Sequence, residues 1–129
     1  MKIVTQLAIF MENRPGMLAR ICQALAKSQV NILALSIVDA ADHAVVRMVV
    51  DKTDEAKRAL ESLHAWVQAR DVVFMDVPNQ AGALARIAEQ LTEAGINLEY
   101  AYCTTSPWHS AGAIVLRTND LEGTINALS

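Results

Sequence analysis

Residues 3–11 fall into two alternating sets that both contain apolar and polar side chains. One set is Ile3, Thr5, Leu7, Ile9 and Met11, and the other is Val4, Gln6, Ala8 and Phe10. A period of two is typical of a β-strand, because successive side chains point to opposite faces of a sheet. Apolar residues stand on both sides of this run, so we expect a strand that is partly covered on both faces. The first element is therefore predicted to be a strand.

The hydrophobic period lengthens to three and four residues at Leu18, Ile21, Cys22 and Leu25. This spacing is typical of an amphipathic α-helix. Pro15 suits a first helical turn, and Asn13 or Arg14 is expected near the cap. We expect the helix to end at Gln29.

The segment 13–32 recurs at 79–98, at a constant offset of 66 residues. Eight of the twenty aligned positions are identical. A period of this length holds a whole small domain, whereas helical solenoid repeats usually run to about 30–45 residues. We therefore predict two domains, at residues 1–69 and 70–129. The identical pairs are Asn13/Asn79, Gly16/Gly82, Leu18/Leu84, Ala19/Ala85, Arg20/Arg86, Ile21/Ile87, Leu25/Leu91 and Asn31/Asn97.

A β-hairpin is expected after each repeated helix, because two β-rich runs follow it in both copies. In the first copy ILALSIV and AVVRMVV are joined by a turn at residues 40–43, and in the second copy the runs are INLEYAYCT and AGAIVLR. Each hairpin should return the chain to the strand that precedes the helix.

A second helix is predicted from Thr53, and its counterpart from Asn119, whose spacing to Glu122 matches a capping box. Gly95 is expected to end the helix before the second hairpin. Residues 66–77 must serve both as the last strand of the first domain and as the first strand of the second, so we expect one long shared strand. The sequence thus predicts an α+β fold of two tandem ferredoxin-like βαββαβ domains, antiparallel sheets with helices on one face, the second lacking its last strand.

Charge and cysteine content narrow the possible partners. The 129-residue chain has 53% hydrophobic residues and a formal net charge of -3, with its eleven Lys and Arg scattered. This balance suits a packed core and offers no basic surface for nucleic acid. Cys22 and Cys103 are isolated, so neither a metal site nor a cofactor is expected. No signal peptide or membrane-spanning run is visible, which favours a cytoplasmic protein without a membrane partner.

Catalysis finds little support in these residues. No Ser, His and acid arrangement, phosphate-binding loop or Cys and His ligand set is visible. An acylphosphatase-like activity would need an arginine in a glycine-rich phosphate turn, and Arg14, the only candidate, is replaced by Gln80 in the second copy. We therefore expect no enzymatic activity. Arg20 and Arg86 are expected to point to solvent, with contact to a bound anion as the alternative.

The duplicated segments ENRPGMLARICQALAKSQVNI and VPNQAGALARIAEQLTEAGINL resemble the ACT domain family of small-molecule-binding regulatory modules. In that family a turn of the type N-x-P-G-x-L joins the first strand to the first helix, and a segment of the type G-[IV]-N-[IL] opens the second strand. The first copy has N-R-P-G-M-L and Q-V-N-I, and the second has N-Q-A-G-A-L and G-I-N-L. The resemblance covers nearly the whole chain as two tandem copies.

This resemblance implies that a small ligand, usually an amino acid, binds at an interface between two ACT units. A turn glycine lets the backbone approach a ligand, and an asparagine amide both donates and accepts hydrogen bonds. Asn13 and Asn79 could instead only cap helices, and Asn31 and Asn97 could be simple turn residues. The ligand-binding residues implied by the resemblance are Asn13, Arg14, Gly16, Met17, Leu18, Asn31, Ile32, Asn79, Gln80, Gly82, Ala83, Leu84, Asn97 and Leu98.

The strand runs AVVRMVV and AIVL are apolar on both faces, so the side of the sheet without helices is expected to be covered. We predict that another unit or another chain covers it, and that the protein is a homodimer. The expected function is amino acid sensing by a regulatory protein that signals to an enzyme or transporter. The alternative is a ligand-free interaction module, in which the same surfaces only drive assembly.

Overall fold

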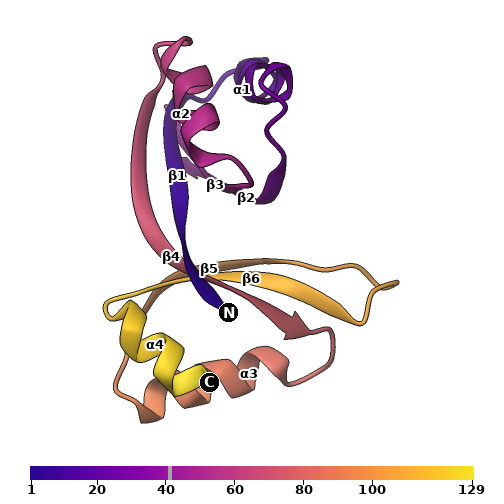
Figure 1. Ribbon diagram of the computed structural model, residues 1–129, viewed down its shortest axis with the longest axis vertical. Helices are drawn as coiled ribbons and strands as arrows, with labels where there is room; N and C mark the ends of the chain where they lie inside the picture. Colours follow the sequence, from indigo (N-terminus) through magenta and orange to yellow (C-terminus); the bar gives the residue numbers. More distant parts are fainter. Residues whose placement is uncertain (41) are drawn as a thin grey trace. The chain divides into compact units, whose positions relative to one another are not determined.

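The computed structural model describes residues 1–40 and 42–129, and these residues form six strands and four helices (Figure 1). Ala41, in the predicted hairpin turn at residues 40–43, lies outside the described residues. The predicted α+β class is confirmed. In chain order the elements are β1 (Lys2–Glu12), α1 (Met17–Lys27), β2 (Ile32–Ala40), β3 (His43–Val50), α2 (Thr53–Glu61), β4 (Trp66–Pro78), α3 (Ala83–Glu93), β5 (Leu98–Thr104), β6 (Ala111–Thr118) and α4 (Leu121–Leu128).

Backbone contacts divide the chain into two compact units. The first unit is Thr5–Arg70, and the second unit is Asp71–Ser129 together with Met1–Val4. β1 and β4 therefore each contribute residues to both units, and β4 is the long shared strand that the sequence predicts. The domain boundary between residues 69 and 70 stays a prediction, and these units differ from it in the place of the first four residues and of Arg70.

In the first unit the strand order is β2-β3-β1-β4, with α1 and α2 packed on one face of the sheet. The antiparallel register sets Leu7 opposite Met48 and Ile9 opposite Val46. These four side chains are buried in one core with Leu25 of α1 and with residues of α2. The side of the predicted alternation that carries Leu7 and Ile9 is thus the side that the helices cover, because one strand face carries every second residue.

In the second unit β6 lies between β4 and β5, and Val73 of β4 pairs with Leu116 of β6. Ile87 and other apolar residues of α3, together with residues of α4, pack against this sheet. No strand follows α4 within the described residues, so no closing strand of this unit is seen there. The start of β1 lies beside β4 in its place, and Ile3 packs against the core.

The start of α1 differs from the predicted one. α1 begins at Met17, and its N-cap is Gly16, with no hydrogen bond from a capping side chain. Pro15 lies in the turn before the helix, and neither Asn13 nor Arg14 caps it. The expected caps were wrong because the left-handed glycine delays the helix by two to three residues.

The start of α4 also corrects a prediction. Asp120, not Asn119, is the N-cap, and its Oδ1 accepts a hydrogen bond of 2.9 Å from the backbone nitrogen of Gly123. Oδ1 of Asn119 instead accepts a hydrogen bond of 3.1 Å from the backbone nitrogen of Asn97. Asn119 and Asp120 thus accept hydrogen bonds from different parts of the chain. The spacing to Glu122 could not show which of the two is the cap.

Helices α1 and α3 end as the sequence predicts. Gln29 has a φ of 56° and Gly95 a φ of 71°, both in the left-handed region. After each of them the next backbone nitrogen donates to a carbonyl five residues back, the pattern of a Schellman motif. α2 ends in the same way at His64, with a φ of 57°. The left-handed conformation of His64 was not predicted, because histidine is not a usual signal for such an ending.

Candidate functional site

The glycine turn that precedes the first helix has the same conformation in both units. Gly16 and Gly82 each have a φ of 87°, which costs a residue with a side chain about 1–2 kcal/mol. No atom lies within 4 Å of the place where a Cβ would stand at either glycine. The backbone conformation, and not crowding, therefore requires glycine. Neither α1 nor α3 has a capping side chain, so both helix starts open onto the turn.

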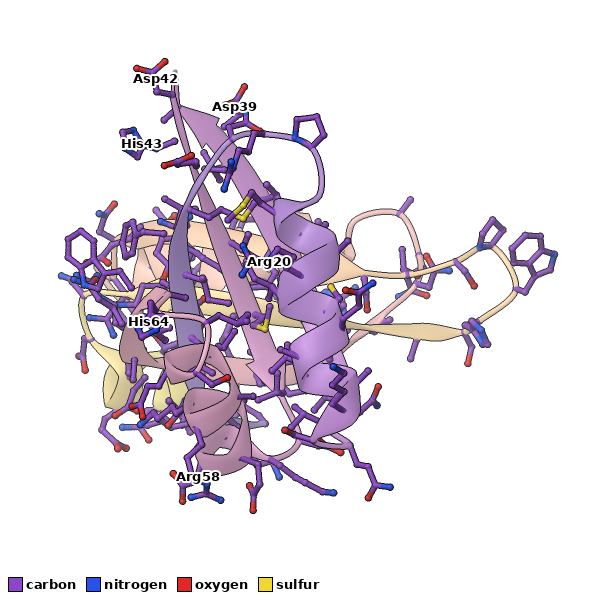
Figure 2. The ribbon with its side chains drawn as sticks, turned by 90° about the horizontal axis from the view of Figure 1, so that it is seen from above. Arg20, Asp39, Asp42, His43, Arg58 and His64 are labelled. Carbon is purple, nitrogen blue, oxygen red and sulfur yellow. The ribbon has the colours of Figure 1, made fainter. Side chains whose placement is uncertain are left out.

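Asn13 joins the first turn to the hairpin between β2 and β3. Its backbone nitrogen donates to the carbonyl of Asp42 at 3.2 Å, and its Nδ2 donates to Oδ1 of Asp39 at 2.6 Å. Figure 2 shows Asp39, Asp42 and His43 together at the end of this hairpin. The side chain of Asn13 therefore holds the turn in place and does not cap the helix.

Asn79 has the equivalent position in the second unit. Its backbone nitrogen donates to the carbonyl of Ser110 at 2.9 Å. Its Nδ2 donates to the carbonyls of Ser106 and His109, both at 2.8 Å. The loop between β5 and β6 is thus held against the second glycine turn by one amide group.

Asn31 and Asn97 lie where the second strand of each unit begins. The backbone nitrogen of Asn31 donates to Oδ1 of Asp51 at 2.8 Å, and the backbone nitrogen of Asp51 donates back to the carbonyl of Asn31 at 3.1 Å. Asn97 makes the same pair of hydrogen bonds with Asn119. Sequence reasoning missed the role of Asp51. Its position as a polar residue directly after an apolar strand could have signalled this role.

A small cavity of about 120 Å³ lies beside the second glycine turn. Asn79 and Gln80 line it from the turn, and Ala83 and Leu84 line it from the start of α3. These are four of the residues that the sequence predicted to bind a ligand. The remaining lining residues are Val77, Pro78, Cys103, Thr104, Thr105 and Gly112.

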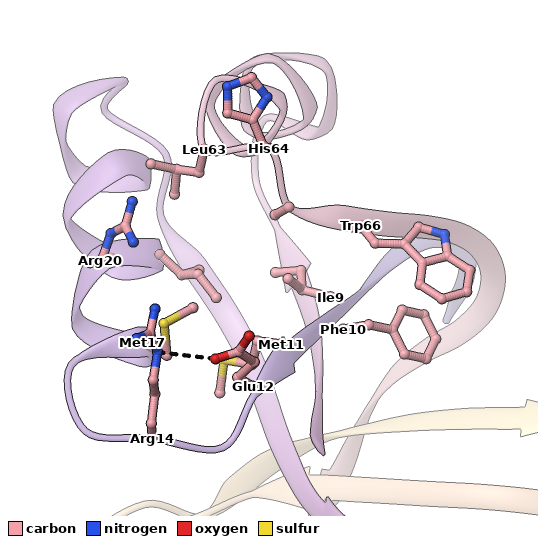
Figure 3. A pocket seen from close by; sticks show the side chains of 12 residues that line it. Ile9, Phe10, Met11, Glu12, Arg14, Met17, Arg20, Leu63, His64 and Trp66 are labelled. Carbon is pink, nitrogen blue, oxygen red and sulfur yellow. Dashed lines mark ion pairs between the residues drawn. The ribbon is translucent and has the colours of Figure 1, made fainter. Parts of the chain in front are cut away.

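A larger cavity, of about 260 Å³, lies inside the first unit (Figure 3). It is bounded by β1, by the turn and first half of α1, and by the connection from α2 to β4. Of the residues predicted to bind a ligand, Arg14 and Met17 line this cavity. The apolar side chains that face it are Ile9, Met11, Met17, Ile21, Leu63 and Ala65.

Charged groups lie on the rim of this first-unit cavity. Nε of Arg14 forms an ion pair with Oε2 of Glu12 at 3.4 Å, and both side chains are exposed. Arg20 projects from α1 toward Leu63 and has no ion pair or side-chain hydrogen bond within residues 1–40 and 42–129. The cavity therefore has one cationic group without a matching anion.

The structure separates the other predicted ligand residues from both cavities. Asn13 and Gly16 shape the first turn without lining its cavity, and Gly82 does the same in the second unit. Leu18 packs against the first core, as does Ile32. Asn31, Asn97 and Leu98 lie at the starts of their strands and line neither cavity.

The connection at residues 63–66 lines the first-unit cavity but was not predicted to do so. It was missed because it is distant in sequence from the turn that it approaches.

The described part of the chain contains neither a group of three metal-binding side chains nor a membrane-spanning helix. Within it, no group of three His, Cys, Asp or Glu side chains is placed to hold a metal ion. No described helix is both long enough and apolar enough to cross a membrane. The cytoplasmic location expected from the sequence stays a prediction.

Two ferredoxin-like units, each with a left-handed glycine before an uncapped helix, define a tandem pair of α+β domains. The family model described as "ACT domain pair" matches residues 1–128. The chain therefore belongs to the ACT domain family, as a pair of such domains, and the resemblance seen in the duplicated segments is confirmed.

Solved structures share this fold over nearly the whole chain. Protein BT0572 from Bacteroides thetaiotaomicron is 34% identical, with a TM-score of 0.90, over 98% of this chain and 86% of that one. The ligand-free regulatory subunit of aspartate kinase from Thermus thermophilus is 18% identical, with a TM-score of 0.72, over 99% and 95%. The corresponding subunit from Thermus flavus is 18% identical, with a TM-score of 0.69, over 98% and 93%. The comparison with curated proteins found no match.

Proposed function

We propose that this protein is a regulatory module that binds a small molecule, with an amino acid as the first candidate. The observation that carries the proposal is the cavity at the second turn, where Asn79 and Gln80 stand at the uncapped start of α3. A helix start favours a carboxylate, and an amide side chain can accept from an ammonium group. The volume of about 120 Å³ favours a small amino acid.

The partner in this proposal is an enzyme or transporter whose activity depends on the occupancy of the module. Similarity in fold to regulatory subunits of aspartate kinase supports a regulatory role. The proposal assigns no catalytic step to the chain itself. A neighbouring ACT unit would complete the site through the residues around Asn31 and Asn97.

Exposed apolar side chains on β2 support the further proposal that the protein is a homodimer. β2 is an edge strand of the first unit, and Leu33, Ile37 and Val38 are 41%, 44% and 45% exposed. An exposed apolar edge favours association with another chain. The same observation favours the competing function, a ligand-free interaction module, so the two functions need a direct test.

A thermal-melting screen of the full chain against a panel of amino acids provides that test. A ligand at 100 times its dissociation constant stabilises the folded state by about 2.7 kcal/mol, which a melting scan detects. We expect a small amino acid to raise the melting temperature, and Gln80→Ala to reduce the rise. Gln68→Ala, an exposed change on β4, is the control and should leave the rise unchanged.

Two outcomes would count against sensing. The first is that no amino acid at millimolar concentration changes the melting temperature. The second is that replacing Asn13 and Asn97 together abolishes dimerisation in analytical ultracentrifugation while no ligand response exists in any variant. That pair of results would instead favour the interaction module.

A further inference from the structure

We infer that the first-unit cavity is a second binding site, one that takes a small carboxylate with an apolar side chain. All the residues that line it belong to Thr5–Arg70, so the first unit alone forms the cavity. The inference does not depend on the proposed function, which is carried by the cavity at the second turn. The two sites differ in position, in size and in charge.

The walls of the cavity suit an apolar group. Met11 of β1, Met17 of α1 and Leu63 of the α2–β4 connection surround it, and all three are half-buried. The rings of Phe10 and Trp66 point away from Met17 and Leu63 (Figure 3), so they do not fill the space. A volume of about 260 Å³ is just below the range of roughly 300–1,000 Å³ typical of sites for drug-sized molecules. The cavity therefore suits a ligand of amino acid size.

The charge on the rim selects an anion. Glu12 and Arg14 balance each other through their ion pair, which leaves the guanidinium of Arg20 as the uncompensated charge. A guanidinium presents parallel N–H donors that match the two oxygens of a carboxylate. An ammonium group would have to compete with Arg14 for Glu12. The ligand therefore needs a carboxylate and an apolar chain, and does not need an amine.

The side of the cavity opposite the turn is held in place by the end of α2. The backbone nitrogen of His64 donates to the carbonyl of Glu61 at 2.9 Å, and that of Ala65 donates to the carbonyl of Leu60 at 3.3 Å. These bonds fix the connection that carries Leu63 toward Arg20. The cavity is thus formed by backbone structure before any ligand arrives, which lowers the entropic cost of binding.

The repeat offers a matched control for Arg20. Arg86 is its equivalent 66 residues later, and it is an exposed residue of α3. Arg86 is not among the residues that line the cavity at the second turn. Arg20→Gln and Arg86→Gln therefore make the same change of charge on equivalent helices, and only the first change affects the first-unit cavity.

The sequence has two tryptophans, Trp66 and Trp108. The test uses the full chain with Trp108→Phe, so that Trp66 is the single tryptophan. Trp66 is among the residues that line the cavity, but its ring points away from Met17 and Leu63 (Figure 3), so isothermal titration calorimetry measures binding and Trp66 fluorescence reports only whether this wall changes. We expect 4-methylpentanoate, which has a branched apolar chain and no amine, to give a saturable heat of binding. Arg20→Gln should weaken binding on the order of tenfold or more. Arg20→Lys should retain part of the affinity, and Arg86→Gln should retain all of it.

The inference is overturned if 4-methylpentanoate gives no saturable heat of binding up to about 10 mM, or if Arg20→Gln and Arg86→Gln weaken binding equally. Trp66→Phe leaves Trp108, on the loop that Asn79 holds, as a reporter on the second turn. An amino acid response at Trp108 that survives Arg20→Gln belongs to the proposed function alone. The two hypotheses can therefore fail separately.

Discussion

Nδ2 of Asn13 lies 2.6 Å from Oδ1 of Asp39, and this hydrogen bond joins the first glycine turn to the hairpin that faces it. Asn79 joins the second turn to its facing loop through two backbone carbonyls instead of a side chain. An amide nitrogen has two hydrogens, so one asparagine can hold two carbonyls together. The repeated asparagine thus has the same structural task in both units, with different acceptors.

This difference predicts unequal costs for removing the two asparagines. Asn79→Ala loses two side-chain hydrogen bonds and Asn13→Ala loses one, each with a net value of about 0.5–1.5 kcal/mol. We expect Asn79→Ala to lower the free energy of unfolding by about 1–3 kcal/mol and Asn13→Ala by about half as much. Urea denaturation measures both. Equal costs would mean that the bonds to Ser106 and His109 add no stability.

The left-handed residues at the ends of α1 and α3 predict opposite effects on stability when each is replaced by the residue found at the other position. Gln29 occupies the position at which the second unit has Gly95, and both have positive φ. Gln29→Gly relieves a backbone cost of about 1–2 kcal/mol, partly offset by the greater freedom of glycine in the unfolded chain. We expect it to raise the free energy of unfolding by about 0.5–1 kcal/mol, and Gly95→Gln to lower it by a similar amount.

Thermal and urea unfolding of the two single variants and of the double exchange check this prediction. Because the positions lie in different units, the double exchange should equal the sum of the single effects within about 0.5 kcal/mol. A destabilising Gln29→Gly would show that the glutamine side chain stabilises the helix end by more than the backbone conformation costs.

Thr118 and Thr124 form a buried chain of hydroxyl groups in the second unit. Oγ1 of Thr124 donates to the carbonyl of Asp120 at 2.7 Å, so it must accept the 2.7 Å hydrogen bond from Oγ1 of Thr118. The two residues are 1% and 0% exposed, so no water can replace a lost partner. Thr124→Val therefore leaves the hydroxyl of Thr118 without an acceptor, at a cost of about 1–3 kcal/mol.

A double-mutant cycle with Thr118→Val tests that direction of donation. Since the double variant removes both hydroxyls together, we expect it to cost less than the sum of the two single variants by about 1 kcal/mol. Additive costs would show that the two hydroxyl groups do not depend on each other.

Asp120 caps α4, and the identity of the cap predicts which substitutions are tolerated. Asp120→Ala removes the acceptor for the backbone nitrogen of Gly123 and should cost about 1 kcal/mol. Asp120→Asn keeps an oxygen acceptor and should cost only a few tenths of that. Guanidinium denaturation monitored by circular dichroism measures both. Equal losses would mean that the negative charge at the helix start, and not the hydrogen bond, stabilises α4.

Much of the fold follows from local pattern. The change in period after residue 12, the repeat at an offset of 66, and the shared strand at residues 66–77 each correspond to an observed element. The errors lie at helix starts, where neighbouring polar residues such as Asn119 and Asp120 have similar propensities. Their roles differ because only Asp120 accepts a hydrogen bond from the backbone of α4, and the three-dimensional geometry decides this.

The sequence by itself determined the two-unit α+β architecture. The hydrophobic periods of strands and helices are local properties of the chain, and they agree with the faces that are buried in the fold. It also identified the glycine turns, since a left-handed conformation strongly favours that residue. Only the tertiary structure decided that Arg20 stands at a cavity while its repeat partner Arg86 does not line the cavity of its own unit. The wall that makes this difference, at residues 63–66, is more than forty residues away in sequence, and side chains so distant come together only when the sheet and helices pack.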